Sequence, residues 1–128
     1  MREMLIISSI LIIIICGAIF TKEYLNNTSN MIVNGLENLK YSIEQENISD
    51  QELIKKSEEI YRNWDNINKQ WSNIVLHEEI DLIETALIRM KSKIKIGELE
   101  ESLEDIDTSI FLVNHINEKE KTSLKNIF

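Results

Sequence analysis

The sequence predicts an all-α protein, with one N-terminal transmembrane helix followed by an antiparallel bundle of three or four helices. Residues 4–21 contain no charged side chain and are mostly aliphatic. In the rest of the 128-residue chain, apolar residues recur at steps of three and four, which is the spacing of a helix face, and not at the steps of two that strands require. Proline is absent and only three glycines occur, so the helices have few breakers.

Residues 4–21 have the length of a membrane span. Eighteen helical residues extend about 27 Å, which is close to the hydrocarbon thickness of a bilayer. We therefore assign residues 1–22 to a transmembrane anchor and residues 23–128 to a helical-bundle domain. Two other interpretations stay open: a secretory signal cleaved near Cys16-Gly17-Ala18, and lipid attachment at Cys16. The apolar stretch is longer than an ordinary signal core of about 7–15 residues. Lipoprotein signals carry a small residue where Ile15 stands.

The orientation in the membrane is predicted from few charges. Arg2 and the amino group precede the apolar segment and Lys22 follows it, while acidic residues count little in the positive-inside rule. With no domain ahead of the span, we expect the amino terminus inside and residues 22–128 outside the cytoplasmic membrane. The single cysteine provides neither a disulfide framework nor a cysteine-based metal site.

The charge of the chain narrows the possible partners. Fourteen basic and 22 acidic residues give a net charge of −8. Nucleic-acid binding depends on clustered lysine and arginine, so we expect no nucleic-acid partner. We also expect the acidic domain to repel an anionic membrane surface.

The first two helices of the domain are predicted over residues 23–46 and 49–75. Residues 26–30 form helices poorly, so the anchor either continues directly into the first helix or kinks there. Ser49-Asp50-Gln51-Glu52 matches a capping box that starts the next helix. That helix carries a coiled-coil-like seam over three heptads. The seam consists of Leu53, Ser57, Ile60, Trp64, Ile67, Trp71 and Ile74.

Two further helices are predicted over residues 78–96 and 98–117. The apolar face turns by about 200° between the Ile74 series and the series that starts at Leu76, at 100° per residue. Either a break near residues 75–79 or one helix over 49–96, about 72 Å long, would explain this, and we favour the break. Gly97 is placed to end a helix. From Asn117 onward we expect a non-helical tail, with its apolar residues packed back on the bundle. These residues are Leu124, Ile127 and Phe128.

The densest group of potentially reactive side chains surrounds His77. In a helix, His77 and Asp81 lie one turn apart, and Glu84 is near enough to join them at a metal ion. A zincin motif would need histidine at position 81, so the match is incomplete. His115 is the second imidazole, and an antiparallel pair of helices turning at Gly97 would bring it to the same end as His77. We expect structural roles for both histidines, with no catalytic residue, cofactor or metal.

The two tryptophans, Trp64 and Trp71, lie seven residues apart on the seam of the predicted second helix. We expect both indoles to pack in the core. The alternative is that they anchor a protein partner, because tryptophan is enriched at binding hot spots.

Several short motifs together resemble a known family. The apolar segment, the two tryptophans, His77-Glu78-x-Ile80-Asp81-x-Ile83, an acidic helix and a closing Asn126-Ile127-Phe128 are similar to small membrane-anchored helical proteins of clostridia and their relatives. That family is catalogued as a domain of unknown function. The resemblance implies a Gram-positive envelope setting and proximity to polytopic membrane proteins, without an established activity.

Three functions stand as hypotheses. The leading one is a non-enzymatic envelope protein that binds or stabilises a membrane protein partner, because the sequence has an anchor and an acidic bundle but no convergent catalytic set. The second is an extracytoplasmic sensor or ligand-binding module. The third is a metal-dependent enzyme centred on His77.

Overall fold

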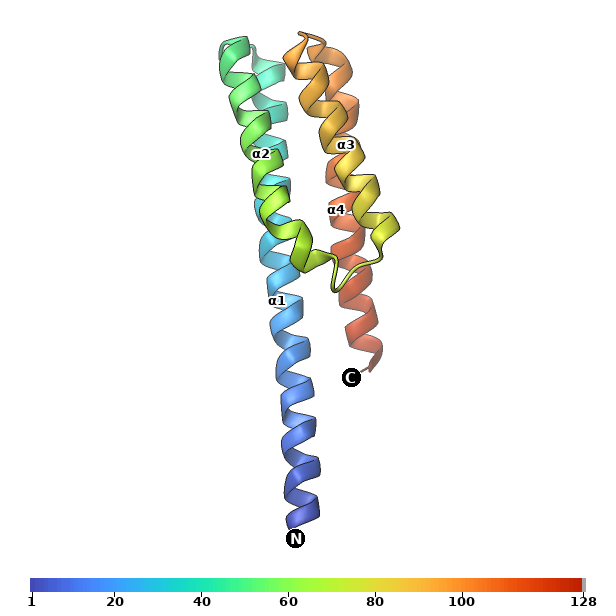
Figure 1. Ribbon diagram of the computed structural model, residues 1–128. Coiled ribbons are helices and arrows are strands. Elements are labelled where there is room, and N and C mark those ends of the chain that lie inside the picture. The colour runs from blue at the N-terminus through green and yellow to red at the C-terminus, as the bar shows by residue number, and fades with distance from the viewer. Residues whose placement is uncertain (128) are drawn as a thin grey trace.

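A computed structural model describes residues 1–127, with side chains described as far as Thr122. Four helices follow one another, and they confirm the all-α prediction: α1 (Arg2–Gln45), α2 (Asp50–Trp71), α3 (His77–Lys95) and α4 (Leu99–Ile127). They form a bundle in which the direction alternates from each helix to the next (Figure 1). Contacts join α1 to α2, α2 to α3, α3 to α4 and α4 back to α1, so the four helices close a ring.

Helix α1 is continuous over 44 residues, and it is packed only in its second half. Its buried residues begin at Leu25, whereas the large apolar side chains from Met4 to Phe20 are exposed. In Figure 1 the N-terminal end of α1 extends well beyond the other three helices. Of the two possibilities left open by the sequence, the structure shows the direct continuation of the apolar segment into the first bundle helix, and residue 22 marks no break in the backbone.

The poor helix-forming run at residues 26–30 stays helical because the bundle holds it. The Thr28 hydroxyl donates to the Tyr24 carbonyl at 2.7 Å and accepts a hydrogen bond from Trp71. Asn26 pairs with Asn117 of α4. These tertiary contacts outweigh the low intrinsic propensity.

The α1–α2 turn follows the predicted capping chemistry. Glu46 takes a left-handed conformation (φ 51°) at the end of α1. The Ser49 side chain then accepts a hydrogen bond from the Glu52 backbone N–H at 3.2 Å, which confirms Ser49 as the N-cap of α2.

The break between α2 and α3 is confirmed, so the single helix over residues 49–96 is wrong. Helix α2 ends at Trp71, earlier than the expected residue 75, and α3 begins at His77. The backbone N–H groups of Ile74 and Val75 both donate to the Trp71 carbonyl and form a tight turn. Val75 is buried and Ile74 packs against the core, so the apolar seam continues through the turn after the helix has ended.

Gly97 ends α3 as expected. Its φ of 84° lies in the left-handed region that glycine adopts without steric cost. The Gly97 N–H donates to the Ile94 carbonyl, and the Glu98 N–H donates to the Lys93 carbonyl. This pair of bonds is a Schellman motif, which satisfies the carbonyls at the helix end.

The expected non-helical tail after residue 117 is wrong, because α4 continues to Ile127. Residues 118–121 suit a helix: Lys121 lies 3.7 Å from the Glu118 carboxylate one turn earlier, and Lys119 pairs with Glu79 of α3 at 2.9 Å. The expected packing of Leu124, Ile127 and Phe128 falls on side chains outside those that the structure describes.

Candidate functional site

Trp64 and Trp71 lie in the core, as expected, and both side chains are 0% exposed. Their rings meet edge to face, with centroids 5.5 Å apart and planes at 76°. The Trp71 indole N–H donates to the Thr28 hydroxyl of α1 at 2.9 Å. Since both rings are enclosed by the bundle, neither offers a surface to a partner in this fold.

The carboxylate of Glu84, between α2 and α3, accepts a hydrogen bond from the indole N–H of Trp64. Glu84 receives hydrogen bonds from the Tyr61 hydroxyl at 2.7 Å, the Trp64 N–H at 3.3 Å and the Asn68 side-chain amide at 3.4 Å. The hydrogen bond to Glu84, together with burial and the negative charge of that carboxylate, raises the pKa of Tyr61 to about 12. The Lys91 ammonium lies 4.2 Å from the centre of the Tyr61 ring.

This network gives Glu84 a structural role that the metal hypothesis did not anticipate. Its two oxygens are already engaged by donors from α2. The sequence pattern did not identify Tyr61 and Asn68 as partners of Glu84, because both lie beside the apolar seam and not in it. A buried indole N–H usually finds an acceptor, so the position of Trp64 was the available signal.

The remaining metal candidates are dispersed. His77 and Asp81 are exposed on the first turns of α3, and His115 is exposed on α4, where it stacks on Phe111 with ring centroids 5.8 Å apart. The Glu79–Lys119 pair sets the register of α3 against α4. In this register His115 is level with Ile83, which lies about 9 Å from His77 along the axis of α3. Within the described residues, no three His, Cys, Asp or Glu side chains are grouped so that they could hold a metal ion.

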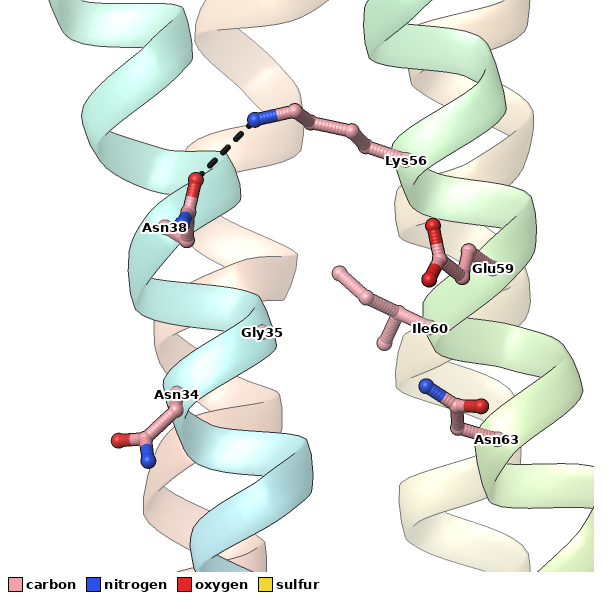
Figure 2. Close-up of a pocket in the computed structure, with 7 residues that line it drawn as sticks. All are labelled: Asn34, Gly35, Asn38, Lys56, Glu59, Ile60 and Asn63. Carbon is pink, nitrogen blue, oxygen red and sulfur yellow. Dashed lines mark hydrogen bonds between the residues drawn. The ribbon is translucent and has the colours of Figure 1, made fainter.

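A shallow hollow with an apolar floor and polar walls lies between α1 and α2, as Figure 2 shows. Gly35 opens it, because a Cβ there would lie 3.3 Å from Cγ1 of Ile60, which forms the floor. The Lys56 ammonium closes one end by donating to the Asn38 side-chain oxygen at 3.1 Å and to the Ser42 hydroxyl at 3.3 Å. The walls offer amide donors and acceptors above an apolar floor. They are formed by Asn34, Gly35, Asn38, Lys56, Glu59, Ile60 and Asn63.

The end of the bundle from which the apolar half of α1 emerges forms a second region of interest, which we call the proximal end. It contains residues 19–28 of α1, the α2–α3 turn and the part of α4 after residue 115. Phe20 and Tyr24 share a small hollow with Ile74 of the turn, and Ile19 and Lys22 share another with Lys121 of α4. The turn and the last part of α4 therefore lie beside the boundary between the apolar and the packed halves of α1.

A polar layer crosses the interior at this end. Asn117 is buried and donates to the Asn26 side-chain oxygen at 3.3 Å, while the buried Ser29 lies on the next turn of α1. Burial raises the pKa of Glu120 on the neighbouring turn of α4, with a further contribution from the charge of Glu79 and an opposing one from Lys119.

One helix, α1, is long and apolar enough by length and composition to cross a membrane, among the residues described. None of its apolar window is buried in the bundle. A signal sequence near an amino terminus has the same properties, so α1 fits either a membrane anchor or a signal sequence.

Comparison with known proteins identifies a family but no characterised relative. Neither the curated proteins nor the solved structures include a match to this chain. The model of the family described as a domain of unknown function, DUF4363, matches residues 19–127. The match covers the whole bundle and leaves most of the apolar segment ahead of it. The chain therefore belongs to the DUF4363 family.

Proposed function

We propose that this protein is a non-enzymatic, single-pass membrane protein whose helical bundle stands on the extracytoplasmic side of the cytoplasmic membrane and binds a membrane protein partner. The uncleaved apolar half of α1 would hold it in the bilayer.

The observation that carries this proposal is the continuity of α1. The apolar half exposes its side chains from Met4 to Phe20, and the same helix enters the bundle core at Leu25 without an intervening linker. Such a connection would fix the position of the bundle relative to the membrane. Exposed aliphatic side chains suit lipid, and they also suit close packing with the transmembrane helices of a partner.

A binding role is also consistent with how the bundle uses its polar residues. Glu84 is engaged by three donors from α2, and the carboxylates of Asp107 and Glu79 are paired with lysines of other helices. These arrangements hold helices together, and they do not converge on a shared point in a cavity.

Crosslinking in native membranes would test whether the protein contacts a membrane protein partner. A photoreactive amino acid at Ile12, in the apolar half, should give a discrete adduct with an integral membrane protein. The same residue at the exposed Ile96 provides a matched control at the other end of the molecule. Adducts with lipid alone at position 12, together with a monomer after mild solubilisation, would reject the partner.

Topology and processing need a separate measurement. Protease added to intact protoplasts should digest residues 22–128, and the mature protein should retain Met1. A protected domain would reverse the orientation, and a mature amino terminus near Ile19 would identify a cleaved signal.

A ligand-binding module is the second candidate, and the hollow of Figure 2 favours it. Its amide walls could hydrogen-bond a small polar ligand. If the protein binds such a ligand, Asn63→Ala should weaken binding, whereas Asn114→Ala, on the exposed face of α4, should not.

A further inference from the structure

We propose that the proximal end of the bundle is a lipid-contacting surface, in which the α2–α3 turn rests in the headgroup region of the bilayer with Leu76 directed into it. This inference rests on the proposed function, since it requires that the apolar half of α1 remain in the membrane.

The register of α4 against α1 brings the end of α4 beside the apolar segment. The Asn117–Asn26 hydrogen bond aligns the two antiparallel helices, and four residues later Lys121 shares a hollow with Ile19 and Lys22. Helix α4 continues for six more residues to Ile127, which is about 9 Å further along the apolar segment. With residues 4–21 in the hydrocarbon layer, the end of α4 therefore reaches the bilayer.

The α2–α3 turn lies at the boundary of the apolar segment. Ile74 shares a hollow with Phe20 and Tyr24, so the turn is level with the end of the predicted span. Leu76 is 63% exposed at the start of α3, although the neighbouring Val75 is buried in the core. Covering an exposed leucine at the boundary of a membrane segment with lipid is favourable, because it removes apolar surface from water.

Charge is distributed differently at the two ends of the bundle. At the proximal end, residues 19–28, 68–80 and 115–127 together carry five acidic and five basic residues. At the opposite end, residues 44–56 and 93–105 carry nine acidic and four basic residues. Only the proximal end therefore avoids repulsion from anionic headgroups, although the protein as a whole has a net charge of −8.

The test uses the full chain, one copy in each phosphatidylcholine nanodisc, so that neither a partner nor a second copy can cover the surface. Cys16, the single cysteine, is replaced by Ala, and an environment-sensitive fluorophore is attached to a cysteine introduced at position 76, 12 or 96. Ile96 is the matched control, because it is an apolar turn residue that is 69% exposed at the opposite end, about 30 Å away along α3.

We expect lipids with a shallow spin label to quench the fluorophore at position 76 by at least about twofold more than at position 96. Deep spin labels should quench position 12 most strongly. Equal quenching at positions 76 and 96, with position 12 quenched, would overturn the lipid-contacting surface alone. Absence of quenching at position 12 would overturn the membrane anchor and this inference together.

Circular dichroism of each labelled protein shows whether the bundle has formed. If the label at position 76 disturbs the start of α3, a label at Asn73, exposed in the same turn, replaces it. The same expectations apply at that position, so the proposal remains open to rejection.

Discussion

Residues 4–20 and residues 25–43 of α1 have the same helical backbone and opposite surroundings. Every large apolar side chain in the first segment is exposed, whereas the second buries one stripe, from Leu25 to Ile43, against α2 and α4. The second segment forms a helix in water because it packs in the bundle. The first needs no such packing in lipid, where a helix satisfies its own backbone groups. Substitutions in the two segments should therefore affect different properties.

The largest contrast is expected between two aromatic residues. Trp71→Ala removes a fully buried ring and its hydrogen bond to Thr28 of α1, so it should lower the free energy of unfolding by about 3–5 kcal/mol. Phe20→Ala removes an exposed ring in the apolar half and should leave that free energy unchanged. Urea unfolding in mild detergent, followed by circular dichroism, measures both. Equal losses would show that the two halves form one cooperative unit.

A leucine in each half of α1 gives a closer comparison. Leu36 is 0% exposed in the bundle, so Leu36→Ala should cost about 2–5 kcal/mol through lost burial and the cavity left behind. Leu11→Ala, with the same change of side chain in the apolar half, should leave bundle stability unchanged. The same unfolding experiment applies, and a stable Leu36→Ala protein would mean that the α1 seam is not essential to the core.

Each half of α1 contains one glycine, and the space around the two glycines differs. At position 35 a Cβ would already lie 3.3 Å from Ile60, so Gly35→Val should overpack the α1–α2 interface by about 1–3 kcal/mol. At position 17 nothing lies within 4 Å of that Cβ, and Gly17→Val should unfold like the wild type. A thermal melt of the detergent-solubilised proteins would show the difference. A stabilised Gly35→Val protein would contradict the close approach of α1 and α2.

The smallest expected effect is a pH dependence of the free energy of unfolding that arises within the bundle alone. The Glu84 carboxylate raises the pKa of Tyr61 to about 12, compared with 10.0 for an ordinary tyrosine. The stability from this pair is therefore fully present below pH 10 and is lost as the pH rises towards 12. The loss should amount to about 1–2 kcal/mol once solvent screening at the partly exposed ring is included.

Two phenylalanine substitutions isolate this alkaline loss. Tyr61→Phe should abolish it, because the titrating hydroxyl is gone. Tyr41→Phe, at an exposed position of α1, should retain it. Urea unfolding at a series of alkaline pH values makes the measurement. An unchanged alkaline loss in Tyr61→Phe would assign it to another group.

Much of the fold could be predicted because each boundary depends on local chemistry. Ser49 caps α2 and Gly97 ends α3 through side-chain or backbone properties that neighbouring residues fix. The burial of Trp64 and Trp71 followed from their place on the apolar seam. The non-helical tail was predicted wrongly because the polar run from Asn117 has no apolar stripe, whereas its helix is supported by the Lys119 pair with Glu79 on α3.

The candidate site depended more on tertiary structure. The sequence placed Glu84 near His77 and Asp81 along the chain, which suggested a shared metal. In the fold Glu84 faces Tyr61, Trp64 and Asn68 across the α2–α3 interface instead. Contacts between helices depend on the relative rotation and register of both helices, and the spacing within one helix does not fix either.

By itself the sequence determined that this chain is helical, that its first segment suits a membrane and that two tryptophans belong in a core. Periodicity, length and side-chain polarity are properties of single segments, so they can be evaluated without a structure. Only the tertiary structure decided that α1 joins the apolar segment to the bundle without a break, and that the α2–α3 turn and the end of α4 lie beside the end of that segment. These arrangements depend on how four helices align, because each helix buries its apolar face only against the others.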